Sequence, residues 1–324
     1  MPLELQVDNG KPHPMQRVVV VGGANMDVSA SSKLPLLTHD STPGDIHCNP
    51  GGVARNVAEN LARLGVDVSL ISVVGDDLFG RRLAAVTAEA GVNIQALATL
   101  PGQRTASYVA VHGQAGELSV AVNDMEILKA LSPALLKPHE ALLQRADCIV
   151  VDCNLSAESL GWILQMDTVS PVFVDAVSVA KCTRLLPHLA KIHTLKVNRL
   201  EAQALLGRAV TSVDDALAAG GTLHAMGVLN VVLSLGQDGA CWCDSSGCVG
   251  HQAAAAVEIV NTNGAGDAMM AGLVHGYLAG RPLDKAVSWA SACAQLTLQS
   301  ALANAPALSV VTVQSLLAHH TMPQ

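Results

Sequence analysis

NTNGAGDAMMAGL, residues Asn261–Leu273, is the stretch on which the interpretation of this chain depends. A small-residue turn, Gly264–Gly266, stands directly before Asp267, and a helix-forming run follows at 268–279. Backbone N–H groups at a helix start have no partner within the helix, and together with the helix dipole they attract an anion. A carboxylate beside a bound phosphate can accept a proton. The stretch therefore predicts a site for phosphoryl transfer to a hydroxyl group.

Short apolar runs alternate with segments of helical period along most of the chain. Strands that alternate with helices build βαβ units, so we predict an α/β fold: a mainly parallel central sheet with helices on both faces. The functional site of such a sheet lies beyond the carboxyl ends of its strands. The predicted strands are 17–22, 68–74, 148–152, 172–175, 194–197 and 231–235, and the predicted helices are 53–64, 81–90, 157–164, 200–206, 213–224, 268–279 and 283–300.

Two segments interrupt this alternation and predict a small β-sheet lid. Ser31–Asn49 contains prolines and has no helical period, whereas Gln103–Asp124 alternates around a Gly113–Gly116 turn, as a hairpin does. Long unstructured loops are uncommon, so we favour a sheet covering the site over two long surface connections. The predicted division is a disordered N-terminal extension at 1–16, an α/β domain at 17–30, 50–102 and 125–324, and the lid at 31–49 and 103–124.

Composition argues against several classes of protein. The formal charge is −8 and no basic run is present, which disfavours nucleic-acid binding. No apolar run approaches the roughly 20 residues of a membrane helix, and the polar N-terminus lacks the apolar stretch of a signal peptide. Eight cysteines without such a signal indicate reduced thiols. We therefore expect a cytoplasmic protein with no nucleic-acid or membrane partner.

Two separated motifs resemble the ribokinase-like carbohydrate and nucleoside kinase family, often called PfkB. The first is GGVARNVA at Gly51–Ala58, with Gly65 and Gly75 at the family's spacing, and the second is Thr262–Leu273 around Asp267. The resemblance extends from Val18 to the last helix. It implies an α/β sandwich with a β lid, a small-molecule acceptor, ATP as phosphoryl donor and Mg²⁺ as cofactor.

The resemblance also implies roles for single residues. Asp267 would be the general base, with N–H groups of Gly264, Ala265 and Gly266 directed at the transferred phosphate. Asn198 and Glu201 match an Asn-x-x-Glu motif that orders Mg²⁺ through water, although Val197 replaces the family's usual proline. Asn261 stands where the family often has aspartate, which puts activation by K⁺ in doubt. The implied ATP-binding residues are Asn198, Ser234, Gly236 and Gly239.

Polar residues after the first strand and in the lid predict an acceptor site. A carboxylate and an amide, as in Asn25 and Asp27, suit paired sugar hydroxyls, with turn capping as the alternative. Asparagine both donates and accepts, so Asn123 and Asn154 suit the edge of a uracil-like base, although ordinary loop polarity explains them equally well. Arg55, Arg104 and Lys181 are left unassigned. The predicted acceptor-binding residues are Asn25, Asp27, Gly51, Gly52, Asn56, Asn123, Asp124 and Asn154.

Within the family, Ala121–Met125 and Asp152–Asn154 resemble the bacterial branch that acts on pseudouridine. The resemblance implies ATP-dependent phosphorylation of the 5′-hydroxyl of a ribonucleoside, with pseudouridine favoured. Another nucleoside, or a free sugar of the ribose or fructose type, is the alternative acceptor. A catalytically silent member that binds or regulates is the alternative from another class. The exposed lid sheet suits pairing with a second subunit, which predicts a homodimer through the lid.

Overall fold

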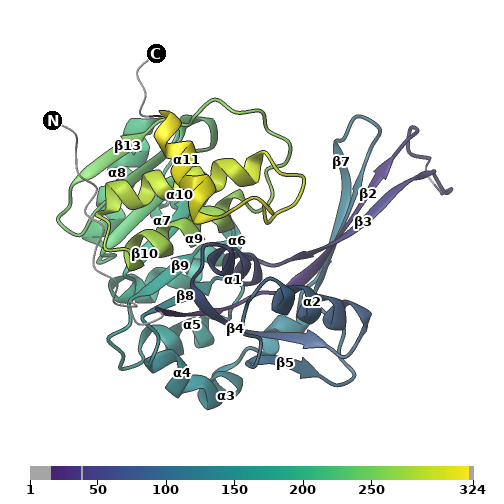
Figure 1. Ribbon diagram of the computed structural model, residues 1–324, viewed down its shortest axis with the longest axis horizontal. Helices are drawn as coiled ribbons and strands as arrows, with labels where there is room; N and C mark the ends of the chain where they lie inside the picture. Colours follow the sequence, from purple (N-terminus) through teal and green to yellow (C-terminus); the bar gives the residue numbers. More distant parts are fainter. Residues whose placement is uncertain (1–15, 38, 321–324) are drawn as a thin grey trace.

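The computed structural model describes residues 16–37 and 39–320, so the predicted extension at 1–16 lies outside the described residues except for Gln16. In this part of the chain, nine strands form a central sheet in the order β13-β12-β11-β10-β9-β8-β1-β4-β5 (Figure 1). Neighbouring strands are parallel from β5 to β11, whereas β12 is antiparallel to both of its neighbours, β11 and β13. The strands are β1 (Arg17–Val21), β4 (Asp67–Gly75), β5 (Leu97–Leu100), β8 (Cys148–Asp152), β9 (Val172–Asp175), β10 (Thr194–Asn198), β11 (Asn230–Ser234), β12 (Ala240–Cys243) and β13 (Val249–Gln252).

Strand β1 shows why the apolar runs become central strands. Val18 and Val20 pack into one hydrophobic core and Val19 and Val21 into the other, on opposite faces of the sheet. A parallel strand buried on both faces has no polar side, so its sequence is continuously apolar. The α/β fold with a mainly parallel sheet is confirmed, and each predicted strand coincides with an observed one.

Helices cover both faces of the central sheet (Figure 1). One core includes residues of α1, α9, α10 and α11, and the other includes residues of α5, α7 and α8. Within the described residues, no helix is long and apolar enough to cross a membrane. The helices are α1 (Val53–Arg63), α2 (Leu78–Glu89), α3 (Pro133–Leu136), α4 (Glu140–Gln144), α5 (Ala157–Leu164), α6 (Val179–Cys182), α7 (Arg199–Leu206), α8 (Val213–Ala225), α9 (Ala265–Leu278), α10 (Leu283–Leu298) and α11 (Val310–His320).

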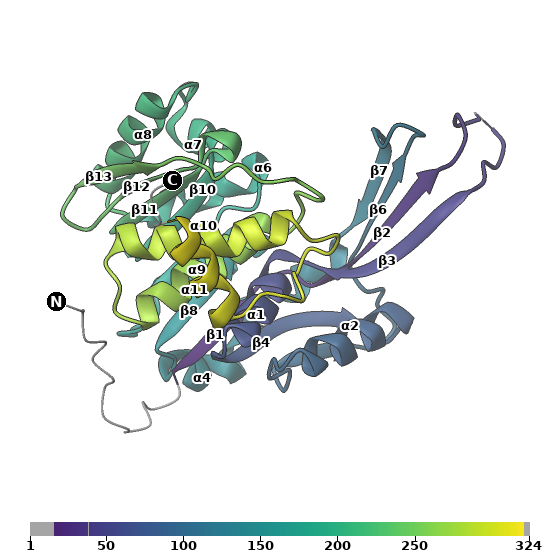
Figure 2. The same ribbon diagram turned by 45° about the horizontal axis from the view of Figure 1, so that its top comes forward.

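A second sheet projects from this body (Figure 2). Its strands run in the order β3-β2-β6-β7; β2 is antiparallel to β3 and parallel to β6, and β6 and β7 form the predicted hairpin. The small sheet begins earlier than predicted, because β2 includes residues 25–30, which we assigned to the α/β domain. The strands are β2 (Asn25–Ser32), β3 (Gly44–Gly51), β6 (Ser107–His112) and β7 (Leu118–Asp124).

The two faces of the small sheet differ in chemistry. Cross-strand pairing puts Asp27, Tyr108 and Asn123 in one row, and side chains alternate between faces along each strand. The next row, on the opposite face, contains Val28, Val109 and Val122. The small sheet therefore has one face with polar groups and one apolar face.

Candidate active site

The carboxyl ends of five parallel strands, β1, β8, β9, β10 and β11, lie along one edge of the central sheet. Asp152, Asp175, Asn198 and Ser234 are the last residues of four of these strands. This is where ligands bind in open α/β sheets. The sheet topology therefore gathers predicted and unpredicted polar residues at one edge.

Asp152 holds three segments together at this edge. Its Oδ2 accepts hydrogen bonds from the backbone N–H of Gly23 (2.9 Å) and Ala54 (3.0 Å), and its Oδ1 accepts one from the N–H of Asn154 (2.9 Å). The side chain is buried, and burial raises the pKa of Asp152 despite these hydrogen bonds. We had not predicted this linking role; its sequence signal is a carboxylate at the end of an apolar run.

Asn25 and Asp27 lie at the start of β2, beside the end of β3. The Asn25 amide donates to Asp27 Oδ1 at 2.6 Å. A Cβ atom on Gly51 would lie 2.2 Å from Asp27 Oδ2, so only glycine leaves room for this carboxylate. Burial raises the pKa of Asp27, and the hydrogen bond from Asn25 opposes that shift. The structure therefore brings three of the predicted acceptor residues into contact.

A hydrogen bond joins the two sequence motifs. Asn56 is in the first motif, on α1, and its Nδ2 donates to Asp267 Oδ2 at 2.8 Å across 211 residues of sequence. Gly52, directly before α1, lies so close to Gly23 that an added Cβ would be 2.5 Å from the Gly23 carbonyl oxygen. The first motif thus lies between the end of β1 and Asp267.

The second motif forms the predicted turn at the start of a helix. Gly264 has φ 80° and precedes α9, which begins at Ala265 rather than at the predicted position 268. Ala265, Gly266 and Asp267 are all partly exposed, so solvent reaches this turn. The helix start is therefore accessible to an anion.

Asp267 is held in an environment that favours its protonated form. Burial of its carboxyl group and the nearby charge of Asp175 raise its pKa from 3.8 to about 7. The hydrogen bond from Asn56 and the charge of Lys196 oppose this rise, whereas Asp152 adds to it. A carboxyl group with a pKa close to neutrality is matched to proton transfer at physiological pH.

A buried ion pair lies beside this turn. Lys196 on β10 donates to Asp175 Oδ2 at 2.8 Å, and both side chains are buried. An added Cβ on Gly266 would be 3.0 Å from Lys196 Nζ, so the ammonium group lies against the start of α9. Sequence reasoning missed both residues, although a single lysine within a buried apolar strand is a recognisable signal.

Asn154 is next to the end of β1. Lys181 Nζ donates to Asn154 Oδ1 at 2.5 Å, which leaves the Asn154 amide nitrogen against Gly23.

The two predicted lid residues lie on opposite faces of the small sheet. Asn123 shares the face of Asp27, whereas Asp124 is on the other face and pairs with Arg104 at 2.9 Å. The geometry therefore groups Asn123, but not Asp124, with the acceptor residues.

Asn198 and Glu201 are held together at the start of α7. Glu201 accepts hydrogen bonds from the Asn198 backbone N–H (2.7 Å) and Nδ2 (2.8 Å), and its own N–H donates to Asn198 Oδ1 (2.9 Å). Ser234 is the cross-strand partner of Asn198, and a turn with positive φ at Gly236 and Gly239 follows it. The four predicted nucleotide-binding residues thus lie at or just after the carboxyl ends of two adjacent strands.

The raised pKa of Asp267 predicts a pH-dependent stability. Between pH 3.8 and about 7 the folded protein retains a proton that the unfolded chain has lost, so stability falls as pH rises through this window. Asp267→Asn removes that titration. We expect its unfolding temperature, minus that of the wild type, to be larger at about pH 8 than at about pH 5. Thermal unfolding of both proteins measures this, and an equal difference at both pH values would contradict it.

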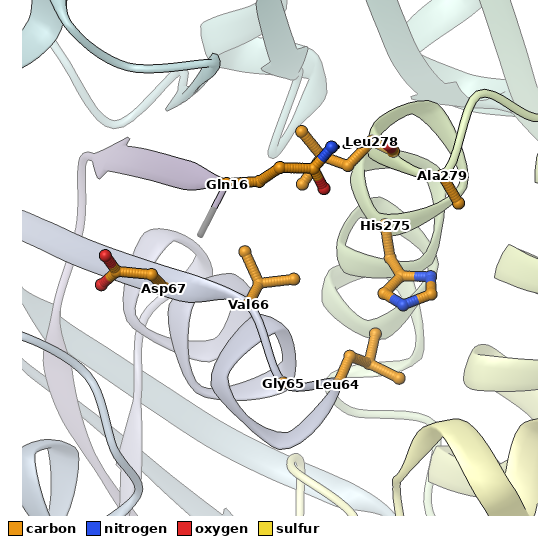
Figure 3. Close-up of a pocket in the computed structure, with 8 residues that line it drawn as sticks. All are labelled: Gln16, Leu64, Gly65, Val66, Asp67, His275, Leu278 and Ala279. Atoms are coloured by element: carbon orange, nitrogen blue, oxygen red, sulfur yellow. Dashed lines mark hydrogen bonds between the residues drawn. The ribbon is translucent and has the colours of Figure 1, made fainter. Parts of the chain in front are cut away.

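A separate cavity lies beside the last turn of α9 (Figure 3). Asp267 is in the first turn of that helix. Its volume is about 170 Å³, and His275 and Leu278 of α9 line it together with Leu64, Val66 and Gln16. It contains none of the predicted site residues. The cavity is therefore distinct from the carboxyl edge of the sheet.

Comparison with known proteins gives a consistent assignment. The sequence pattern of the pfkB family of carbohydrate kinases matches residues 15–309. Pseudouridine kinase of Escherichia coli (strain K12) is 42% identical over 300 residues, covering 93% of this chain and 96% of that protein. The uncharacterized sugar kinase YeiI of the same strain is 39% identical over 299 residues, covering 92% and 83%.

The fold is also shared with solved structures. Arabidopsis thaliana ribokinase complexed with ribose and ATP superimposes with a TM-score of 0.82 at 19% identity, covering 96% of this chain and 100% of that chain. The family match, the similar sequences and the shared fold all indicate a kinase of this family. The chain belongs to the pfkB family of carbohydrate kinases and is a phosphotransferase that uses an alcohol group as acceptor.

Proposed function

We propose that this protein transfers the γ-phosphoryl group of ATP to the 5′-hydroxyl of a ribonucleoside, with pseudouridine as the preferred acceptor. The observation that carries the proposal is the hydrogen bond between Asn56 and Asp267. This hydrogen bond connects the first motif, which we assign to the sugar, with the carboxyl group of Asp267 on the anion-binding turn. A base and a phosphate site side by side are what transfer to an alcohol requires.

Asp267 would accept the proton of the 5′-hydroxyl as its oxygen attacks the γ-phosphorus and the bond to the β-phosphate oxygen breaks. A free alcohol is a much weaker acid than a carboxylic acid, so proton transfer would be late. Most of the rate would come from alignment and charge stabilisation. The backbone N–H groups of Gly264, Ala265 and Gly266 would stabilise the phosphoryl oxygens during transfer.

Asn25 and Asp27 would bind the ribose hydroxyls, with Gly51 and Gly52 letting the ring approach the backbone. Lys181 occupies the Asn154 carbonyl oxygen and the Asn154 side chain also hydrogen-bonds Asp152, so we assign the remaining donor capacity of the Asn154 amide to a ligand. These donors suit the carbonyl oxygens of a uracil ring. Pseudouridine and uridine both carry such oxygens, and pseudouridine has an additional ring N–H.

ATP would lie against β10 and β11, with Ser234, Gly236 and Gly239 beside it. The Glu201 carboxylate is fixed by Asn198, and a fixed hard oxygen donor suits Mg²⁺, which usually keeps several waters. We infer that Asn198 and Glu201 hold Mg²⁺ through water. When bound, the ion supplies positive charge to the phosphates. Asn261 donates to the Ala301 carbonyl at 3.1 Å and brings no negative charge, which leaves activation by K⁺ in doubt.

The small sheet of β2, β3, β6 and β7 would act as the lid, and the remaining described residues from 17 onward as the kinase domain. Support comes from the row Asp27, Tyr108 and Asn123, which places two of the assigned acceptor residues on one face of this sheet. Closure over the sugar would exclude water and limit ATP hydrolysis. We also propose that the protein is located in the cytoplasm.

A parallel acceptor series tests the proposal. Pseudouridine, uridine, adenosine, ribose and fructose are each offered with ATP, and ADP formation is measured. We expect the highest kcat/KM for pseudouridine and no turnover of a 5′-deoxy nucleoside. Equal kcat/KM for ribose and pseudouridine would remove the nucleoside assignment and favour the sugar acceptor, which the resemblance to YeiI supports.

We further propose a homodimer formed through the apolar face of the lid. On this face Ile46, Val120 and Val122 are each more than half exposed, at 69%, 54% and 65%. Clustered exposed apolar residues mark an interaction surface. We propose that a second copy of this chain covers this face, because a twofold axis brings the same face of two subunits together.

A charge on this face should separate the dimer. Val122→Asp would bury a carboxylate in the interface, and we expect a monomer by size-exclusion chromatography with light scattering, against a dimer for the wild type. Val169→Asp is the control, because Val169 is 100% exposed outside the lid and the same charge there should leave the dimer intact. A wild type that is monomeric at micromolar concentration would refute this proposal.

A further inference from the structure

A buried polar network lies behind the Asn56–Asp267 hydrogen bond. Arg55 on α1 is 2% exposed. Its Nη1 donates to Asn56 Oδ1 (3.0 Å) and Asn304 Oδ1 (2.8 Å), its Nε donates to Thr87 Oγ1 (3.2 Å), and its Nη2 pairs with Glu59. Each of the three guanidinium nitrogens therefore has a polar partner, and these partners come from α1, α2 and the loop before α11.

The contact with Asn56 fixes which way its amide points. An asparagine side chain has one acceptor and one donor end. Arg55 takes the oxygen, so the nitrogen is the end that faces Asp267. A flipped amide would put its N–H₂ against the guanidinium and its oxygen against the carboxylate, which are two repulsive contacts. The network thus allows one orientation of the Asn56 amide.

Stability alone does not account for this arrangement. Removing a guanidinium and a carboxylate from water is costly, and replacing a buried ion pair by apolar residues is often neutral or stabilising. Asn304 adds to the fixation by donating to the Asn56 backbone oxygen (2.9 Å) and to Asn60 Oδ1 (2.9 Å). The same loop touches the anion-binding turn, since an added Cβ on Gly264 would be 2.0 Å from the Ala303 carbonyl oxygen.

We infer that Arg55 is a positioning residue for phosphoryl transfer: through the Asn56 amide it holds the Asp267 carboxylate in place and supports its ionised form. This inference rests on the proposed function. Arg55 contacts neither of the reacting groups that we assign, and it acts through Asn56. Its positive charge also favours the ionised form of Asp27, whose carboxylate we assign to the acceptor.

The charges around Asp267 set the direction of the expected pH effect. Asp175 on β9 and Asp152 on β8 raise the pKa of Asp267, whereas Lys196 on β10 and the Asn56 hydrogen bond lower it. If the amide loses its fixed orientation, the hydrogen bond weakens and the pKa of Asp267 rises further. The acidic limb of the rate profile would then move to higher pH.

A double-mutant cycle tests this inference. We expect Arg55→Met to lower kcat by about 10- to 100-fold, with the KM for ATP little changed and the acidic limb moved upward. Asn56→Ala should give a similar loss. Adding Arg55→Met to Asn56→Ala should cause little further loss in kcat, because Arg55 acts through Asn56.

Arg63→Met is the matched control, because Arg63 pairs with the same Glu59 but makes no contact with Asn56. Its kcat and pH profile should equal those of the wild type. If Arg55→Met is unfolded at the assay temperature, Arg55→Lys takes its place under the same criteria. The inference is overturned if the Arg55 variant behaves like Arg63→Met, or if the two losses multiply. Undiminished turnover by Asp267→Asn would instead overturn the proposed function.

Discussion

Replacing Asp267 with asparagine should lower kcat by about three orders of magnitude, within the range for loss of a general base. Asparagine is nearly the same size, so the start of α9 and the contact region with Asn56 should persist. The amide cannot accept the proton of the attacking hydroxyl. We therefore expect the KM values for ATP and for the acceptor to stay close to those of the wild type. Steady-state kinetics at neutral pH measure all three quantities.

The matching control separates catalysis from helix stabilisation. Asp284 is in the first turn of α10, where a carboxylate also interacts with the helix dipole, but it lies outside the site. Asp284→Asn should leave kcat unchanged. If Asp267→Asn lost no more activity than Asp284→Asn, the carboxylate would be a helix-terminal charge and nothing more.

The central sheet was predictable because its physical cause is local. The run Val18–Val21 must bury both of its faces, and each such run identifies a strand without knowledge of its neighbours. The residues at which the helices begin were less predictable. Helix α2 begins at Leu78 because the Asp77 side chain accepts the Gly80 N–H, an N-cap that apolar periodicity does not register.

Strand β2 was only partly predictable because its stability comes from its partners. NMDVSASS has little apolar content, and Asn25 and Asp27 are typical of turns. Pairing with β3 and β6 makes it a strand. In such a case the neighbouring strands decide whether a segment becomes a strand, and a single sequence does not show which segments will be neighbours.

The site was predictable where its chemistry is written in a compact motif, as around Asp267. It was less so where function depends on contacts between distant segments. Lys196 and Asp175 are on different strands, and only the parallel pairing of β9 and β10 brings them together beside Gly266. Arg55 was left unassigned because neither its burial nor its contact with Asn304 can be inferred from its position in the first motif.

Replacing Gly264 with alanine should lower kcat/KM for ATP by about 100-fold, because it displaces the turn that we assign to the phosphate. Gly264 has φ +80°, and an added Cβ would be 2.0 Å from the Ala303 carbonyl oxygen and 2.6 Å from its carbon. Both colliding atoms belong to the backbone, so no rotamer change relieves the contact. The turn or the loop at Ala303 must move.

Gly280→Ala separates this displacement from ordinary backbone strain. Gly280 has φ +67°, and an added Cβ there has nothing within 4 Å. Both variants should lose about 1–2 kcal/mol of stability from the left-handed conformation, seen as a lower unfolding temperature. Only Gly264→Ala should also lose activity. If the two variants kept equal kcat/KM for ATP, the position of the turn would not matter for transfer, and its N–H groups could not be the donors that stabilise the phosphoryl group.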